Sequence, residues 1–160
     1  MTRRALVVRG GWDGHQPEAT TDLFLPFLRE QGFEVRLGIE AADAPHGGVI
    51  VNNASVLGWR AQHSQSHYAA AKAGVMALTR SAAMDLAEHG IRVNAVSPSL
   101  AMHPFLEKVT SAELLAELKQ REAFGRAAEP WEVANVMVFL ASEYASYMTG
   151  EVVSVSSQHA

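Results

Sequence analysis

Three side chains near the middle of the chain, Ser55, Tyr68 and Lys72, have types and a spacing that suit hydride-transfer chemistry. Tyr68 and Lys72 are four residues apart, so on a helix they share one face. A phenol has a pKa near ~10 and is a poor acid or base at neutral pH unless its pKa is shifted. A nearby ammonium favours the phenolate and is expected to lower that pKa. Ser55 would then hold a carbonyl or hydroxyl oxygen at the place where Tyr68 gives or takes a proton.

The segments around these residues predict the elements that position them. An apolar run over residues 49–54 is typical of a buried strand, and it ends just before Ser55. Residues 67–89 predict a long helix that carries Tyr68 and Lys72 and ends at Gly90, a usual C-terminal cap. A further buried strand is predicted over residues 92–97.

The rest of the chain continues this alternation of strands and helices. Thr110 to Glu113 forms a capping-box pattern, Pro130 suits a first helical turn, and Pro26 interrupts a helical pattern. The other expected elements are strands over residues 5–8, 34–39 and 151–156 and helices over residues 18–31, 110–121 and 130–142. The pattern predicts an α/β fold with a mostly parallel sheet of about five strands and helices on both faces.

We expect a single domain over residues 1–160 with a change of character at residues 41–48, a loop rich in Ala, Asp, Pro and Gly. Only about eight residues separate the strands on its two sides, whereas a parallel crossover usually takes about a dozen or more. Either a bare loop crosses one face of the sheet, or the two strands run antiparallel.

Composition excludes several classes of partner and site. The formal charge is −4 with no basic block, so nucleic acid and anionic membranes are poor partner candidates. No apolar run reaches the ~20 residues that cross a bilayer, and the absence of cysteine fits a cytoplasmic location. His63 and His67 have the spacing of metal ligands, but no third ligand stands nearby, so no metal site is predicted.

From about residue 47 to its end, the chain resembles the short-chain dehydrogenase/reductase family. The motifs that carry the resemblance follow one another in order, at residues 51–58, 67–72, 92–98, 124–134 and 147–155. The resemblance implies NAD(P)-dependent interconversion of a secondary alcohol and a ketone. It implies that Tyr68 is the acid/base, that Lys72 lowers its pKa and binds the nicotinamide ribose, and that Ser55 orients the substrate oxygen.

The same resemblance assigns further residues to the cofactor and the substrate. Pro98, Ser99 and Leu100 follow a strand, and the backbone of Leu100 would meet the nicotinamide carboxamide. Met102 stands where the family usually has a threonine, which removes one cofactor hydrogen bond. The residues expected at the substrate end are Leu57, Trp59 and His63. A narrower resemblance, to actinobacterial members, suggests steroid-derived or acyl-CoA substrates.

The family's N-terminal block does not match this chain, so the fold is expected to be an incomplete Rossmann-like one. The family opens with a glycine-rich turn, and here Gly10 and Gly14 are followed by Gln16 and Pro17. We therefore expect NAD or NADP to bind weakly, with the choice between them open. Loss of a neighbouring helix predicts self-association, either as a dimer or as a poorly soluble aggregate. The dimer would form through Val75, Leu78 and Val152.

Residues 1–40 instead resemble the start of the trehalose-utilisation family, which has a glutamine-amidotransferase-like fold. The resemblance rests on residues 4–17 and 24–35, and Trp12, Asp13 and His15 would be remnants of a sugar site. Two alternatives therefore stand beside the oxidoreductase. One is a non-catalytic α/β module that binds a full-length relative, and the other is a sugar-related amidotransferase-like protein.

Overall fold

A computed structural model describes residues 3–8, 22, 25–30, 33–38 and 48–158 of the chain. Five strands form one sheet in the order β2-β1-β3-β4-β5, and every pair of neighbours is parallel. The strands are β1 (Arg3–Val8), β2 (Phe33–Gly38), β3 (Gly48–Asn53), β4 (Ile91–Pro98) and β5 (Val152–Val155). The predicted parallel α/β sheet is confirmed.

The direction of β2 settles one of the alternatives left open by the sequence. β2 is parallel to β1 over six residue pairs, and β1 is parallel to β3 with Leu6 opposite Ile50. β2 and β3 therefore run the same way, and the antiparallel alternative is wrong. The connection itself, residues 39–47, lies outside the described residues, as do the glycines and sugar-site candidates of residues 10–17.

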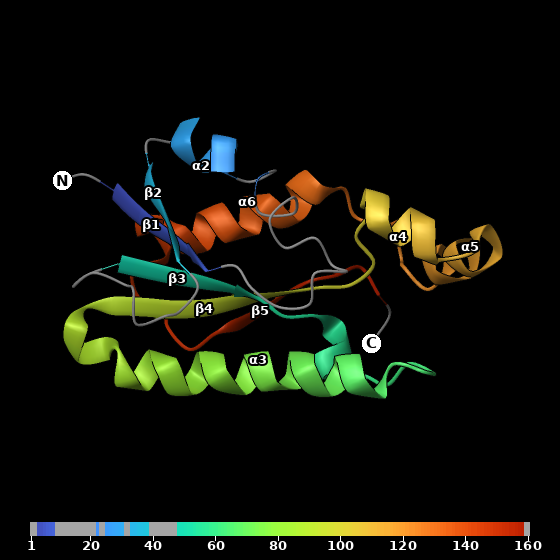
Figure 1. The fold of residues 1–160 in the computed structure, drawn as a ribbon, viewed down its shortest axis with the longest axis horizontal. Coiled ribbons are helices and arrows are strands. Elements are labelled where there is room, and N and C mark those ends of the chain that lie inside the picture. The colour runs from blue at the N-terminus through green and yellow to red at the C-terminus, as the bar shows by residue number, and fades with distance from the viewer. Residues whose placement is uncertain (1–2, 9–21, 23–24, 31–32, 39–47, 159–160) are drawn as a thin grey trace.

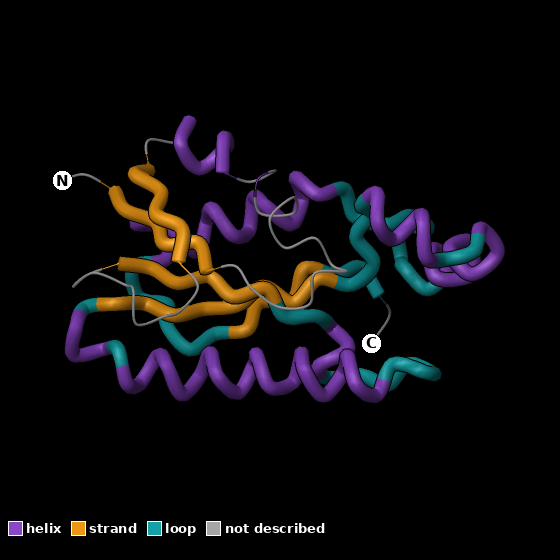
Figure 2. Tube along the Cα trace, in the orientation of Figure 1, coloured by secondary structure: helices purple, strands orange, loops and turns teal. Residues whose placement is uncertain are grey.

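Helices cover both faces of the sheet, as the sequence predicts (Figure 1). α3 (Ser66–Asp85) lies along one face, and α2 (Leu25–Glu30) and α6 (Pro130–Ala141) lie on the other. α4 (Pro104–Val109) and α5 (Ala112–Gln120) stand beyond the end of the sheet where β4 and β5 finish. Loops gather at that same end (Figure 2). Among the described residues, no helix has the length and apolar character needed to cross a bilayer.

β4 lies at the centre of the core because both of its faces are covered. Val93 and Ala95 pack toward α3, whereas Val96 packs toward α6 with Val133 and Leu140. All five side chains are almost fully buried. β4 also carries polar side chains, and two of them, Asn94 and Ser97, are fully buried among the apolar ones.

Two helix ends differ from the sequence-based expectation. The predicted helix over residues 67–89 is divided: α3 ends at Asp85, and a 3-10 turn over residues 87–89 leads to Gly90 in the left-handed conformation, with φ 69°. The tighter turn lets the chain reverse into β4. Ser111, not Thr110, caps α5 by accepting a hydrogen bond from the Leu114 amide. The sequence analysis missed α4, which has only six residues.

Arg92 on β4 holds the end of α6 in place. Its guanidinium donates hydrogen bonds to the backbone carbonyls of Leu140 at 2.9 Å, Ser142 at 3.1 Å and Met148 at 3.3 Å. These carbonyls include ones that a helix end leaves without partners. One side chain therefore joins α6, the turn after it and the approach to β5 to the central strand.

Candidate active site

Ser55 stands where β3 gives way to a tight turn. The Ala54 amide donates to the carbonyl of Val96 at 2.8 Å, so pairing with β4 continues up to the residue before Ser55. Ser55 then caps the 3-10 turn Val56–Gly58, and its Oγ accepts a hydrogen bond from the Leu57 amide at 3.3 Å. Its exposure is only 8%. Strand pairing and the cap thus fix the backbone that carries the hydroxyl.

Gly58 lets this turn pack directly against α3. A Cβ added at Gly58 would lie 2.6 Å from Cε of Met76 and 3.1 Å from the backbone nitrogen of Ala73. Atoms cannot approach so closely without displacement, so only a glycine fits this position as it stands. The distance between the Ser55 turn and α3 therefore depends on this residue.

Tyr68 lies in the first turn of α3, and a hydrogen bond joins it to the side chain of Ser55. Burial raises the pKa of the Tyr68 phenol above its ordinary value, and the bond with Ser55 offsets part of that rise. The expected lowering of this pKa by the Lys72 ammonium is therefore wrong for this structure. The loss of hydration raises the pKa of Tyr68 by more than the hydrogen bond from Ser55 lowers it.

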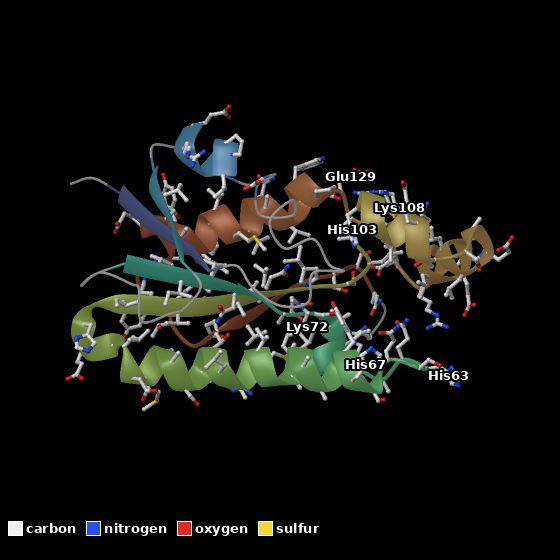
Figure 3. The ribbon with its side chains drawn as sticks, in the orientation of Figure 1. His63, His67, Lys72, His103, Lys108 and Glu129 are labelled. Carbon is white, nitrogen blue, oxygen red and sulfur yellow. The ribbon has the colours of Figure 1, made fainter. Side chains whose placement is uncertain are left out.

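Lys72 is one turn further along α3 and points toward the end of β3 (Figure 3). Its Nζ donates to the carbonyl of Asn53 at 2.9 Å and lies 5.6 Å from the centroid of the Tyr68 ring. Burial lowers the pKa of the Lys72 ammonium. Its pKa and that of Tyr68 shift in opposite directions, but both shifts disfavour the charged form, as desolvation requires.

The three side chains thus meet at the carboxyl end of β3. The site offers a neutral phenol as proton donor, a hydroxyl bonded to it and an ammonium one helical turn away. With the Tyr68 pKa raised, the phenol stays protonated at neutral pH. The arrangement is suited to giving a proton to an oxygen that gains negative charge.

The residues expected at the substrate end lie on the loop between Ser55 and α3. Leu57 is half-buried, and Trp59 is exposed. Nδ1 of His63 lies 2.8 Å from Oγ of Ser64, which has a φ of 61°. Figure 3 shows His63 beyond the first turn of α3, away from Lys72. Within the described part of the chain, no group of three His, Cys, Asp or Glu side chains could hold a metal ion.

The sequence predicts that the backbone of Leu100 meets the nicotinamide carboxamide, but in the structure both backbone groups of Leu100 already have partners. The Leu100 amide donates to Oε1 of Glu122 at 3.3 Å, and its carbonyl accepts from the Ala128 amide at 2.8 Å. The Met102 amide donates to the Ala128 carbonyl at 3.0 Å, so Ala101 bridges Ala128 in parallel fashion. Neither backbone group of Ala101 bonds to another described residue. Within the described part of the chain, Ala101 rather than Leu100 has backbone groups without a partner.

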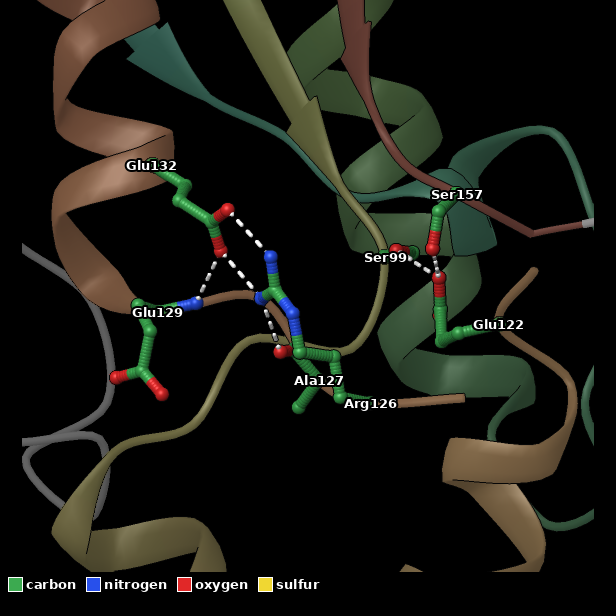
Figure 4. A network of polar contacts seen from close by, with 7 residues as sticks. All are labelled: Ser99, Glu122, Arg126, Ala127, Glu129, Glu132 and Ser157. Carbon is green, nitrogen blue, oxygen red and sulfur yellow. Dashed lines mark hydrogen bonds and ion pairs between the residues drawn. The ribbon is translucent and has the colours of Figure 1, made fainter. Parts of the chain in front are cut away.

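Glu122 is a residue of this site region that the sequence analysis missed. It is 3% exposed, and its carboxylate accepts hydrogen bonds from Ser99 Oγ at 3.0 Å and Ser157 Oγ at 2.9 Å (Figure 4). It also accepts one from the Leu100 amide. Glu122 follows the end of α5, where a charged residue reads as solvated, so no pattern in the sequence signals its burial. Beside it lies a pocket of about 140 Å³ whose lining includes Phe124 and Arg126.

Comparison with known proteins gives a family match over most of the chain. Residues 39–157 match the family described as enoyl-(acyl carrier protein) reductase. A reductase of Mycobacterium tuberculosis (strain H37Rv) is 76% identical over 117 residues, which cover 73% of this chain and 45% of the reductase. It is named for (5R,7aS)-5-hydroxy-7a-methyl-1-oxo-2,3,5,6,7,7a-hexahydro-1H-indene-carboxyl-CoA. The chain thus spans less than half the length of this relative.

Solved structures agree with this match. A short-chain dehydrogenase from Mycobacterium smegmatis has 66% identity and a TM-score of 0.56, over 73% of this chain and 40% of that one. A 7α-hydroxysteroid dehydrogenase complexed with NADH and 7-oxo glycochenodeoxycholic acid has 32% identity and a TM-score of 0.67. That similarity covers 70% of this chain and 44% of the dehydrogenase.

Proposed function

Because the chain belongs to the short-chain dehydrogenase/reductase family, we propose that its site interconverts a secondary alcohol and a ketone with NAD or NADP. The observation that carries the proposal is the hydrogen bond between Ser55 and Tyr68, with Lys72 on the next turn of the same helix. Since the chain spans 45% of its reductase relative, this activity is a proposal for the chain itself.

In the reductive direction, Tyr68 donates its phenolic proton to the carbonyl oxygen of the substrate. The Ser55 hydroxyl donates a hydrogen bond to the same oxygen and holds it near Tyr68. The Lys72 ammonium, one helical turn from Tyr68, would bind a ribose hydroxyl of the dinucleotide. The dinucleotide, when bound, supplies or accepts the hydride.

The described residues fit the nicotinamide end of such a cofactor. Among the described residues, the N–H and C=O of Ala101 have no partner and Lys72 has no carboxylate partner. The two Ala101 groups match the acceptor and the donor of a carboxamide. Pro98 ends β4, and Ser99 begins the loop that carries Ala101. We propose weak affinity, because the family's glycine turn is interrupted in this sequence.

For the substrate, we propose a ring ketone or alcohol carried on a CoA thioester or derived from a steroid. Support comes from the names of the relatives, a bicyclic carboxyl-CoA reductase and a hydroxysteroid dehydrogenase. Leu57, Trp59 and His63 lie on the loop after Ser55, at the edge of the site. The apolar side chains of this loop would contact one face of a flat ring.

The proposal is tested by titrating the chain with NADH and NADPH while following energy transfer from its three tryptophans to the nicotinamide. Turnover with a cyclic ketone is then compared between the wild type and Tyr68→Phe. Tyr147→Phe serves as control, since Tyr147 is fully exposed. We expect Tyr68→Phe alone to abolish turnover at unchanged dinucleotide affinity. Equal turnover of the two variants would overturn the assignment of Tyr68.

A second candidate is a non-catalytic module that binds a full-length relative. It is favoured by the coverage, because more than half of each relative has no counterpart in this chain. Absence of dinucleotide binding in the same titration would favour it. We also propose that the chain self-associates and is located in the cytoplasm. For residues 1–40 we propose an amidotransferase-like origin. The parallel pair β1 and β2 suits many α/β families and does not identify one.

A further inference from the structure

Glu122 is a buried carboxylate that no cation balances among the described residues. Its three hydrogen-bond donors are the Ser99 hydroxyl, the Leu100 amide and the Ser157 hydroxyl, at 3.0, 3.3 and 2.9 Å. A buried charge is costly unless its acceptor positions are filled. The donors come from two segments far apart in sequence, so the carboxylate is satisfied only while both segments stay in place (Figure 4).

The second segment is the C-terminal tail, and it also touches the other side of the site. The Ala123 amide donates to the Ser157 carbonyl at 2.6 Å, and Glu122 pairs with Gln158 in an isolated antiparallel bridge. Oε1 of Gln158 accepts a hydrogen bond from Nη1 of Arg60 at 2.8 Å. Arg60 follows the turn that Ser55 caps. The tail therefore joins the loop after β3 to the loop after β4.

The loop after β4 is held from two sides at the residues flanking Ala101. Glu122 binds the Leu100 amide, while Ala128 binds the Leu100 carbonyl and the Met102 amide. The bonds to Ala128 fix the two peptide planes that carry the N–H and the C=O of Ala101, and these two groups have no partner among the described residues. Glu122 fixes the preceding peptide plane through the Leu100 amide, so it sets the direction in which the chain enters Ala101.

We propose that Glu122, held by Ser157, is a positioning residue that aims the backbone of Ala101 at the carboxamide of the nicotinamide. This inference rests on the proposed function for its ligand. Glu122 does not touch the cofactor in this proposal, since it acts through Leu100. A carboxylate suits the task because its two oxygens accept several hydrogen bonds at once and bind donors more strongly than a neutral acceptor does.

The test uses the full chain and compares Glu122→Ala, Glu122→Gln and Ser157→Ala with a control, Glu117→Gln. Glu117 has its own arginine partner on the exposed side of α5. The first measurement is amide hydrogen exchange of Leu100 and Met102, the bonded amides on either side of Ala101, against residues 93–96 of β4. We expect Glu122→Ala to speed exchange in the loop by about tenfold, because bonds to a charged group are lost, while β4 is unchanged. Glu122→Gln retains an acceptor and should recover most of the protection.

The second measurement is the affinity for NADH, with turnover measured in the same variants. We expect Glu122→Ala to raise the Kd and KM for NADH by about tenfold with little change in the KM for the ketone, since bonds to a charged group are lost from the loop. Equal effects on both KM values, or faster exchange throughout β4, would show general destabilisation and overturn the inference.

The two proposals can fail separately. Absence of NADH binding in the wild type would overturn the proposed function and the cofactor role of Glu122. The exchange measurement would then still decide whether Glu122 and Ser157 hold the loop. Unchanged exchange in Glu122→Ala overturns the positioning role whatever the affinity for NADH.

Discussion

The Tyr68 phenol and the Lys72 ammonium are both partly withdrawn from water, and this controls how the site should respond to pH. Burial raises the pKa of Tyr68 and lowers that of Lys72. The two groups are therefore driven toward their neutral forms. A site of this kind is prepared to donate a proton, and it needs a further positive charge nearby before it becomes a strong base.

The raised pKa of Tyr68 predicts opposite pH dependence for the two directions of reaction. Ketone reduction uses the protonated phenol, so its rate should stay level and fall only above pH ~10, the ordinary pKa of the group. Alcohol oxidation uses the phenolate, so its rate should still be rising at that pH. The check is kcat/KM in both directions across the alkaline range. An oxidation rate that levels off below pH ~9 would contradict the raised pKa.

The same shift makes a prediction for stability. The folded state holds the Tyr68 proton more tightly than the unfolded state, so this group contributes stability that is present below pH ~10 and lost as pH rises through the raised pKa. Urea unfolding of the wild type and Tyr68→Phe at several alkaline pH values measures the difference. The wild type should lose more stability than the variant. Parallel curves would refute the linkage.

Lys72→Met should separate function from stability. The Lys72 ammonium is desolvated, and its hydrogen-bond partner among the described residues is the carbonyl of Asn53, so the folded state carries the cost of burying the charge. We expect turnover to be lost while the thermal midpoint stays the same or rises. Lys119→Met on α5 is the control. A clear drop in the midpoint of Lys72→Met alone would mean that the charge stabilises the fold.

At the scale of elements, the contact between the Ser55 turn and α3 decides the geometry of the site. Gly58→Ala would place a Cβ against the end of the buried Met76 side chain and close to the backbone of Ala73, so Met76 must shift and the turn must move slightly from α3. We expect destabilisation of about 1–3 kcal/mol, typical of overpacking, and a larger loss in kcat than in cofactor affinity.

Gly74→Ala on the same helix is the matched control for that change. A Cβ at Gly74 meets nothing within 4 Å, and alanine is favoured over glycine inside a helix by about 0.5–1 kcal/mol. This variant should be slightly more stable than the wild type and equally active. Similar destabilisation of both variants would mean that the close approach at Gly58 is unimportant.

Arg92 makes a second prediction at this scale. Arg92→Ala should destabilise the chain by about 2–4 kcal/mol, because two backbone carbonyls at the end of α6 and that of Met148 before β5 lose their donor. Arg92→Lys should not restore stability, since one ammonium cannot reproduce the planar fork of the guanidinium. Urea unfolding monitored by circular dichroism gives both values. Full rescue by lysine would show that charge, not geometry, is what matters.

At the scale of the whole molecule, the outer face of α3 exposes apolar side chains. Leu78 is 61% exposed on this helix, and Met84 is exposed further along it. Val75 and Val152 are half-buried and pack beside the cluster of Ala54, Met76 and Ala95. Apolar residues gathered on one face of a helix are a usual basis for association between chains.

We therefore predict concentration-dependent self-association that Leu78→Glu reduces. Leu78→Glu places a charge on the associating face, and association would have to remove water from that charge. Leu114→Glu, on the exposed side of α5, should leave association unchanged. Light scattering at several protein concentrations measures the mass of each. A monomeric wild type, or equal behaviour of the two variants, would exclude association through this face.

Much of this protein follows from local sequence alone. The apolar residues of β3 and β4 and the alternation of strands with helices indicate the parallel α/β sheet. The interval from Ser55 to Tyr68 and the one-turn spacing to Lys72 place these side chains together at the carboxyl end of β3. Such features depend on burial and helix periodicity, which a short stretch of sequence records.

The tertiary structure decided what depends on segments distant in sequence. Whether β2 runs parallel to β3 is set by β1 between them, and neither strand's residues specify it. The Tyr68 pKa depends on how much water the folded chain removes, which outweighs the lysine visible in the sequence. Glu122 became a buried acceptor only because Ser99 and Ser157 arrive from either side. A charged residue is buried when the fold supplies its partners, and those partners are 23 and 35 residues away.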